Sequence, residues 1–160
     1  MDVIAIFISG ISLLFSLFTF ILEKNRQKKY DTLEAIKDLQ NNVINQFHNE
    51  TRNYLAGNKQ KDGSLALRIG GEDYYKLATE CLVAIEHFSV GVNNGIFDKK
   101  IVKECGGAYF CRLYQFLKPV IEKKKVTSPD GEHYDNFTKL YNTLLKYYKD
   151  KDIYYHPTKN

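Results

Sequence analysis

The chain has 160 residues, of which 26% are charged and 44% hydrophobic, with three prolines and a formal net charge of +4. This composition excludes a disordered chain and a strongly basic nucleic-acid-coating protein, although the small positive excess suits an anionic ligand or a lipid surface. Three cysteines, an odd number, do not indicate a disulfide framework and fit a reducing compartment. Two of them, Cys105 and Cys111, are predicted to be small core residues and not ligands.

The first segment, residues 1–22, is predicted to be a transmembrane helix. No charged residue lies between Asp2 and Glu23, and the 20 residues from Val3 to Leu22 would span about 30 Å as a helix. A cleavable signal peptide would need a basic start and a shorter apolar core. Basic residues follow the span at Lys24, Arg26, Lys28 and Lys29, so we expect the amino terminus outside and the remainder in the cytoplasm.

Small and polar residues form a stripe along this predicted helix, at alternating steps of three and four. We call them the polar seam: Ala5, Ser9, Ser12, Ser16 and Thr19. Lipid does not satisfy hydroxyl groups, so the seam predicts a partner helix. The stripe could also arise by chance, since single Ser and Thr residues are tolerated almost anywhere in a spanning helix. One functional interpretation is close packing between helices. The other is a homo-oligomer, with a tetramer favoured, whose seam lines a pore with constrictions at Leu13 and Phe20, next to Ile6 in the same heptad position.

Residues 23–56 lack proline and glycine, and their apolar residues recur at a helical period, at Tyr30, Leu33, Ile36, Leu39, Val43, Phe47 and Leu55. This pattern predicts a long juxtamembrane helix, either continuous with the span or separate from it. Residues 57–71 are rich in glycine and charge and are predicted to be a loop. Its end, "LRIGG", places Arg68 before two glycines, which suits either an anion-binding turn or an ordinary turn.

Residues 72–150 are predicted to be a helical cytosolic domain, followed by a tail at 151–160. The expected helices cover 72–94, 98–116 with Asp98 as the cap, and 134–149. Gly106 and Gly107 require a bend or a close neighbour, and Pro119 a kink or restart. We therefore expect an all-α protein: a membrane helix followed by an antiparallel bundle.

Evidence for chemistry is sparse in the sequence. It contains none of the common catalytic or zinc-binding motifs, so we expect no enzyme, no metal and no cofactor. Glu86 and His87 form one adjacent acid–base pair, typical also of a surface or a satisfied core group. The basic run Lys123, Lys124 and Lys125 suits a helix end or, with Arg68, an anionic ligand. The twelve tyrosines offer stacking faces for bases or ordinary core packing, and we expect no readout of duplex nucleic acid.

The stretch "CLVAIEHFSVGVNNGIFDKKIVKECGGAYFCRLYQFLKPVIEKKK", followed by "YDNFTKLYNTLLK", resembles a bacterial domain family of unknown function that often lies behind one transmembrane helix. The matching positions are Glu86, Gly91, Gly95, Ile96, Asp98, Arg112, Lys118, Pro119 and Glu122. Proteins of this build are similar to channel effectors of nucleotide-signalling anti-phage systems. The resemblance implies a bacterial inner-membrane location and a nucleotide or oligonucleotide ligand, and it carries over no ligand-binding residue.

Two hypotheses follow. In the first, a homo-oligomeric single-pass protein forms an ion pore that its cytosolic domain gates in response to a nucleotide signal. In the second, the protein is a membrane-tethered scaffold that binds a protein partner and conducts nothing. The residues also allow a third hypothesis, an enzyme that uses Glu86 and His87, which a His87→Ala variant tests.

Overall fold

The structure is a computed structural model that describes residues 2–58, 62–128 and 133–150. The side chains of residues 2–6 and 150 are outside the description. Every regular element within the described ranges is helical, which confirms the all-α fold. The elements are α1 (Asp2–Leu39), a π-helical segment (Gln40–Ile44), α2 (Asn45–Tyr54), α3 (Gly63–Asn93), α4 (Lys99–Cys105), α5 (Gly107–Thr127) and α6 (Asp135–Asp150).

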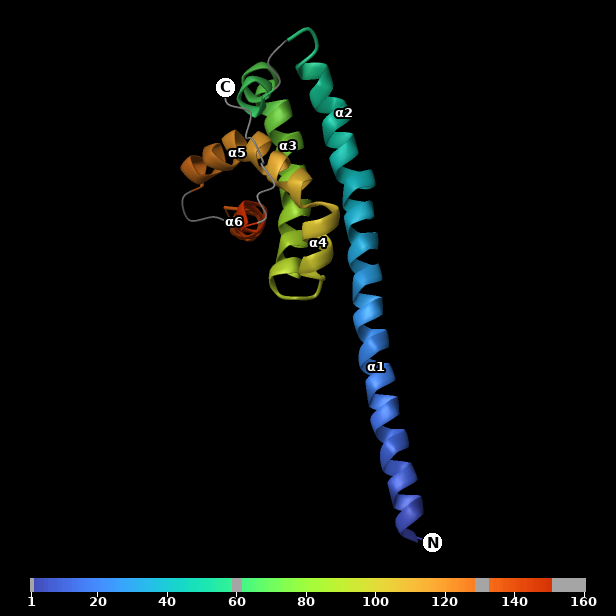
Figure 1. The fold of residues 1–160 in the computed structure, drawn as a ribbon. Coiled ribbons are helices and arrows are strands. Elements are labelled where there is room, and N and C mark those ends of the chain that lie inside the picture. The colour runs from blue at the N-terminus through green and yellow to red at the C-terminus, as the bar shows by residue number, and fades with distance from the viewer. Residues whose placement is uncertain (1, 59–61, 129–132, 151–160) are drawn as a thin grey trace.

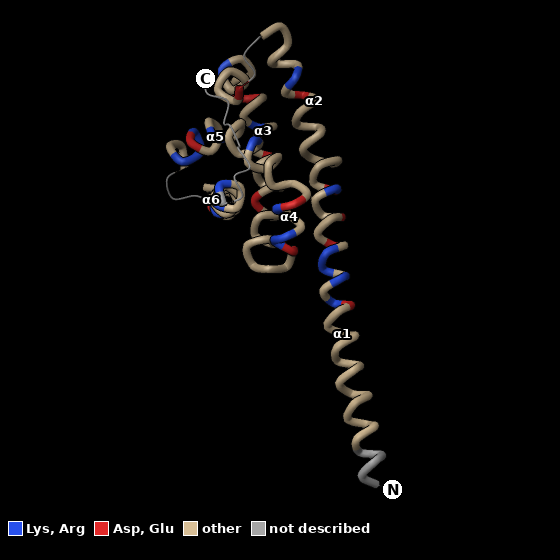
Figure 2. Tube along the Cα trace, viewed as in Figure 1, with Lys and Arg blue, Asp and Glu red and all other residues tan. Residues whose placement is uncertain are grey.

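One uninterrupted rod runs from α1 through the π-helical segment to the end of α2 (Figure 1). Its N-terminal part extends away from all the other helices, and its C-terminal part lies beside them. On the rod, the first charged residues after the apolar part lie close to the level of the nearest other helices (Figure 2). The rod is long and apolar enough to cross a membrane by length and composition. The sequence left open whether the apolar segment and the juxtamembrane helix are continuous, and α1 shows that they are, since it runs from Asp2 to Leu39 without interruption.

The π-helical segment shifts the positions of the residues that follow it, so that the buried face of the rod stays in line. Its first turn closes through a hydrogen bond from the Asn45 N–H to the Gln40 carbonyl, five residues back. Leu39 and Ile44 are five positions apart, and the wider turn keeps both on the side of the rod that is buried against the domain. After the π-helical segment, Phe47 of α2 continues the buried face at ordinary helical spacing.

Helix α3 is the centre of the bundle, and it packs against α2, α5 and α6. The core between these helices is aromatic and aliphatic. Its largest fully buried side chains include Phe47, Tyr74, Leu82, Ile85, Phe110, Leu117, Ile121, Phe137 and Leu144.

The predicted loop at 57–71 is wrong over residues 63–70, which form the first part of α3. The Asp62 side chain caps this part, since its Oδ1 accepts from the Leu65 N–H at 2.7 Å. A kink follows at Gly71, where φ is 54° and ψ is −130°. Glycine tolerates this backbone conformation, so the "GG" pair marks a bend between two helical parts instead of a loop.

The predicted helix at 98–116 is divided into α4 and α5 at Gly106. Asp98 caps α4 as expected, by accepting from the N–H groups of Lys100 and Ile101. Gly107 lies so close to α6 that a Cβ there would meet the Tyr148 hydroxyl at 2.5 Å. Pro119 lies inside α5, which continues to Thr127 without a restart.

Candidate functional site

The polar seam lies on a fully exposed part of α1. Its hydroxyls bond to carbonyls of their own helix: Ser12 donates to Ile8 at 2.9 Å, and Ser16 to Ser12 at 2.9 Å. Thr19 donates to Phe15 at 3.1 Å and to Ser16 at 2.9 Å. These bonds satisfy the hydroxyl protons without a partner helix, yet each oxygen keeps lone pairs that can accept further hydrogen bonds.

The other predicted residues of this segment lie as follows. Ser9 is exposed in line with the seam. Leu13 and Phe20, the predicted constrictions, are 63% and 65% exposed. Ala5 is part of α1, but its side chain is among those outside the description, as is that of Ile6.

The seam continues beyond the apolar segment. The same spacing of three and four reaches Glu23, Arg26, Tyr30 and Leu33, and we call the whole stripe from Ser9 to Leu33 the extended seam. Tyr30 is 54% exposed and Leu33 42%, although both were counted with the apolar face of the juxtamembrane helix. The Arg26 guanidinium lies 5.6 Å from the centre of the Tyr30 ring. The heptad spacing itself was the signal that would have separated these two residues from the buried face.

The helical domain packs on the opposite side of α1. A helix turns about 100° per residue, so Thr32 lies about 160° around the axis from Tyr30, and Leu39 about 180°. Thr32 is completely buried, and its hydroxyl accepts from the Asp98 N–H at 2.8 Å while donating to the Lys28 carbonyl at 2.7 Å. The domain therefore leaves the side chains of the extended seam exposed from Ser9 to Leu33, although Glu23 borders a groove beside Gly95 and Ile96.

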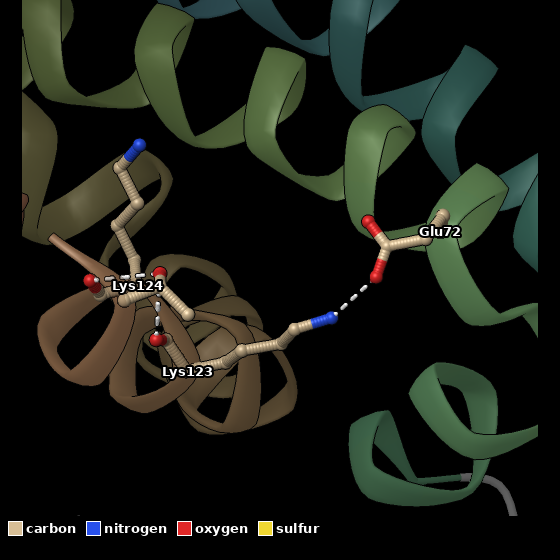
Figure 3. Close-up of polar contacts among 4 residues, drawn as sticks. Glu72, Lys123 and Lys124 are labelled. Atoms are coloured by element: carbon tan, nitrogen blue, oxygen red, sulfur yellow. Dashed lines mark hydrogen bonds and ion pairs between the residues drawn. The ribbon is translucent and has the colours of Figure 1, made fainter.

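The four candidate anion-binding residues are held differently from one another. The Lys123 ammonium pairs with Glu72 at 2.8 Å and lies 4.3 Å from the centre of the Tyr75 ring. Figure 3 shows Lys124 pointing away from Glu72. Arg68, in the first part of α3, and Lys125 are both exposed. A bound anion would have to compete with Glu72 for Lys123.

Glu86 has a structural role in this fold. Its carboxylate accepts from the Asn136 N–H at 3.0 Å, the Asn136 side-chain amide at 2.9 Å and the Phe137 N–H at 2.8 Å. These bonds cap the first turn of α6 and tie it to α3. The neighbouring His87 is exposed. The carboxylate is thus already occupied by three donors, which argues against its use as a general base.

The remaining polar groups of interest link helices or lie in the core. His48 Nε2 is 2.7 Å from the Tyr109 hydroxyl, which joins α2 to α5. Burial, with a smaller effect from Arg52, lowers the pKa of His48, and burial raises the pKa of Tyr109 to about 12. Burial also raises the pKa of Cys81 to about 12, which keeps this thiol protonated.

Cys105 was predicted to be a small core residue together with Cys111. Cys111 is buried, and its pKa is raised to about 11 by burial. Cys105 is exposed, so the prediction is wrong there. The reason is the break at Gly106, which ends α4 and separates the two cysteines into different helices.

A comparison with protein-family models matches residues 6–144 to a family described as a domain of unknown function (DUF4760). Comparisons with curated proteins and with solved structures give no match. The family match includes the apolar part of α1, whereas the resemblance in the sequence was limited to residues 76–147. Because it covers most of the chain, from the apolar helix to α6, the protein belongs to the DUF4760 family.

Proposed function

We propose that this protein is a single-pass protein of the bacterial inner membrane, with its amino terminus outside and its helical domain in the cytoplasm. It assembles as a homo-oligomer around the extended seam and conducts ions through the polar part of that seam. The α1 segment that ends at Leu22 crosses the bilayer, and the basic residues that follow set the orientation. The proposal includes no enzymatic step.

The observation that carries the proposal is the division of α1 into two faces. The domain occupies the face of Thr32 and Leu39, while the opposite face is exposed from Ser9 to Leu33. Copies of the chain can therefore bring their α1 helices together without a clash between their domains, which lie at the periphery. The spacing of three and four along this face is the heptad pattern of helices that supercoil around one another.

The driving force for assembly differs along the seam. In water, contact between copies would remove Tyr30 and Leu33 from solvent, which the hydrophobic effect favours. Within the bilayer, the small side chains of Ser12 and Ser16 would allow close approach of the helices. If four or more helices surround an axis, the remaining lone pairs of these hydroxyls suit a hydrated cation.

Gating would use the continuity of the rod. No break separates the apolar segment from the helices that pack on the domain, so a movement of the domain would reach the span directly. In this proposal Leu13 and Phe20 narrow the pore, and a nucleotide or oligonucleotide signal acts on the domain. The nature of that signal and a role in anti-phage defence come from the resemblance. Arg68, Lys124 and Lys125 are the exposed or outward-pointing cations available to it.

A membrane-tethered scaffold is the alternative, and one observation favours it. Since Ser12, Ser16 and Thr19 satisfy their hydroxyl protons within α1, the seam does not require water or a polar partner. The same face would then pack helix against helix and conduct nothing.

The deciding experiment replaces Ser12 and Ser16 together by Leu in the full chain, reconstituted into liposomes. A pore predicts the loss of ion flux, and a scaffold predicts that there was none in the parent protein. The matched control replaces Phe15 and Phe18, which lie outside the seam, by Leu. Flux that survives Ser12→Leu with Ser16→Leu would contradict the pore.

The mass of the detergent-solubilised particle tests the assembly itself. An oligomer is expected for the parent protein. Leu33→Glu should shift the particle toward the monomer, because it places charge on the extended seam. Val83→Glu is the control, since Val83 on α3 is 43% exposed, close to the 42% of Leu33. A parent protein that is monomeric in mild detergent would overturn the assembly.

A further inference from the structure

The connection between α3 and α4 presents an apolar side chain to solvent. Ile96 is 66% exposed at its tip, whereas the next residue, Phe97, turns inward and stacks on Phe88 with 5.2 Å between ring centres. Gly91 makes room for Phe97, since a Cβ at that position would lie 2.6 Å from the ring. The turn thus buries one apolar side chain and exposes its neighbour.

The exposure of Ile96 is built into a well-held turn. The N–H groups of Ile96 and Phe97 both donate to the Gly91 carbonyl, at 2.9 and 3.2 Å. Gly95 has a φ of 76°, a conformation that suits glycine. The following residue, Asp98, is tied to Thr32 of α1 by the 2.8 Å bond described above. These contacts fix the position of Ile96 relative to α1.

That position is at the level of the lipid headgroups. Ile96 and Gly95 share a groove of about 810 Å³ with residues of α1 between Phe20 and Asp31. The middle of this stretch lies about 5 Å beyond Leu22, the last residue of the apolar run. The headgroup layer of one leaflet is about 5–8 Å thick. In Figure 1 the α3–α4 turn is the part of the domain that lies furthest toward the N-terminal end of α1.

The charges around the turn complement an anionic surface. Lys99 and Lys100 follow it and are exposed, and Lys24 and Lys28 line the α1 side of the groove. The acidic groups that face the same region are those of Glu23, Asp31 and Asp98. The carboxylates of Asp31 and Asp98 already accept hydrogen bonds from neighbouring groups of the protein. Asp31 accepts from the Gln27 amide at 2.7 Å, and Asp98 accepts from the N–H groups of Lys100 and Ile101. The balance is positive, and an apolar tip with flanking lysines suits the boundary of a bilayer that contains anionic lipid.

We propose that the α3–α4 turn is a second membrane contact: Ile96 enters the headgroup layer, and Lys99 and Lys100 lie against lipid phosphates. The occupant is bilayer lipid because copies of the chain would meet along the extended seam, of which Glu23 alone borders the groove, so lipid and not a neighbouring helix lies beneath the turn. The inference rests on the proposed crossing of the membrane by α1. It would hold the domain at a fixed tilt on the membrane surface.

Because the chain contains no tryptophan, single tryptophans can report this contact in the full-length protein. Three variants are reconstituted into vesicles of phosphatidylcholine and phosphatidylglycerol: Ile96→Trp, Phe15→Trp and Val126→Trp. Phe15 reports the span, and Val126, which is 82% exposed at the end of α5, is the exposed apolar control. Emission wavelength and quenching by lipids brominated at known depths are measured.

The expected result has three parts. Phe15→Trp is quenched by deeply brominated lipid, Ile96→Trp by shallowly brominated lipid with emission shifted to shorter wavelength, and Val126→Trp by neither. Ile96→Trp that behaves like Val126→Trp while Phe15→Trp is quenched would overturn the lipid contact and leave the span intact. A blue-shifted but unquenched Ile96→Trp would assign the turn to a second copy of the chain and also overturn it. An unquenched Phe15→Trp would refute the span and this inference with it.

The lysines are tested in the Ile96→Trp background. Replacing Lys99 and Lys100 by Gln should lower the ratio of docked to undocked domain by about fivefold per lysine in vesicles with anionic lipid. Raising the salt concentration should have a similar effect, because exposed charges are screened. The control pair is Lys139→Gln with Lys146→Gln, two exposed lysines of α6, which should change nothing. Equal quenching in vesicles with and without phosphatidylglycerol would overturn the role of the lysines.

Discussion

The two faces of the rod formed by α1, the π-helical segment and α2 meet different surroundings, although one continuous rod carries both. One face contains Thr32, Leu39 and Ile44, which are buried against the domain and held in register by the π-helical segment. The other carries the extended seam, in which Tyr30 and Leu33 remain exposed. Each face repeats at helical spacing, so periodicity alone shows that both are helical and does not show which one the domain covers.

The buried face therefore stabilises the fold, whereas the exposed face carries the proposed function. Removing side chains from the domain face should unfold the protein, because that face is part of the core. Removing them from the extended seam should leave the fold intact and change only assembly.

The sharpest comparison truncates one aromatic side chain on each face. Phe47→Ala should lower the free energy of unfolding by about 3–5 kcal/mol, because Phe47 is 1% exposed and its removal leaves a cavity. Tyr30→Ala should change it by less than about 0.5 kcal/mol, since Tyr30 is 54% exposed, and should weaken self-association instead. Thermal unfolding in detergent and particle mass measure the two effects. Similar destabilisation by both variants would contradict the division into two faces.

The Glu86 cap separates a structural role from the catalytic one that the sequence allowed. Glu86→Ala should cost about 2–3 kcal/mol of stability, because two backbone N–H groups and an amide lose a charged acceptor. His87→Ala, on the neighbouring exposed residue, is the control and should be nearly neutral. Circular dichroism during urea unfolding measures both. A stable Glu86→Ala protein would show that α6 does not depend on this cap.

Much of the helical architecture could be predicted because it depends on local signals. The uncharged run before Glu23 and the Asp98 cap each specify an element from a few neighbouring residues. The first part of α3 was missed because its cap, Asp62, is followed by Gly63, while "GG" at its end suggested a loop. Gly63 is nevertheless required, since a Cβ there would collide with the Phe116 carbonyl of α5.

The site depended on contacts between distant parts of the chain, which one sequence does not reveal. Nothing near Glu86 announces that α6 begins beside it, 50 residues later. The pairing of Lys123 with Glu72 likewise joins residues 51 positions apart. The extended seam, by contrast, could be recognised in the sequence from its spacing. Only the structure shows which face of α1 the domain leaves exposed, and therefore that Tyr30 does not belong to the buried face.

Thr32 connects the domain face to the α3–α4 turn, so its loss should loosen the turn without unfolding the bundle. Thr32→Val should cost about 1–2 kcal/mol, because the Asp98 N–H loses its acceptor in a partly buried site. Thr32→Ser is the matched control and should retain most of the stability. Amide hydrogen exchange at residues 94–98 should rise in Thr32→Val and much less in Thr32→Ser. Unchanged exchange would mean that the turn is held by its own hydrogen bonds.

The smallest expected effect is a pH dependence at His48, where α2 meets α5. Burial lowers the pKa of His48 below its ordinary value of 6.5, so the unfolded chain binds more protons than the folded protein near and below that pH. The free energy of unfolding should therefore be highest above pH 6.5 and fall as the pH drops through 6.5 toward the lowered pKa. His48→Gln removes the titrating group. The difference in urea midpoint between the parent and His48→Gln should be constant above pH 6.5 and shift against the parent below it. A difference that stays constant from about pH 8 to about pH 5 would show that the contact of His48 with Tyr109 does not favour the neutral imidazole.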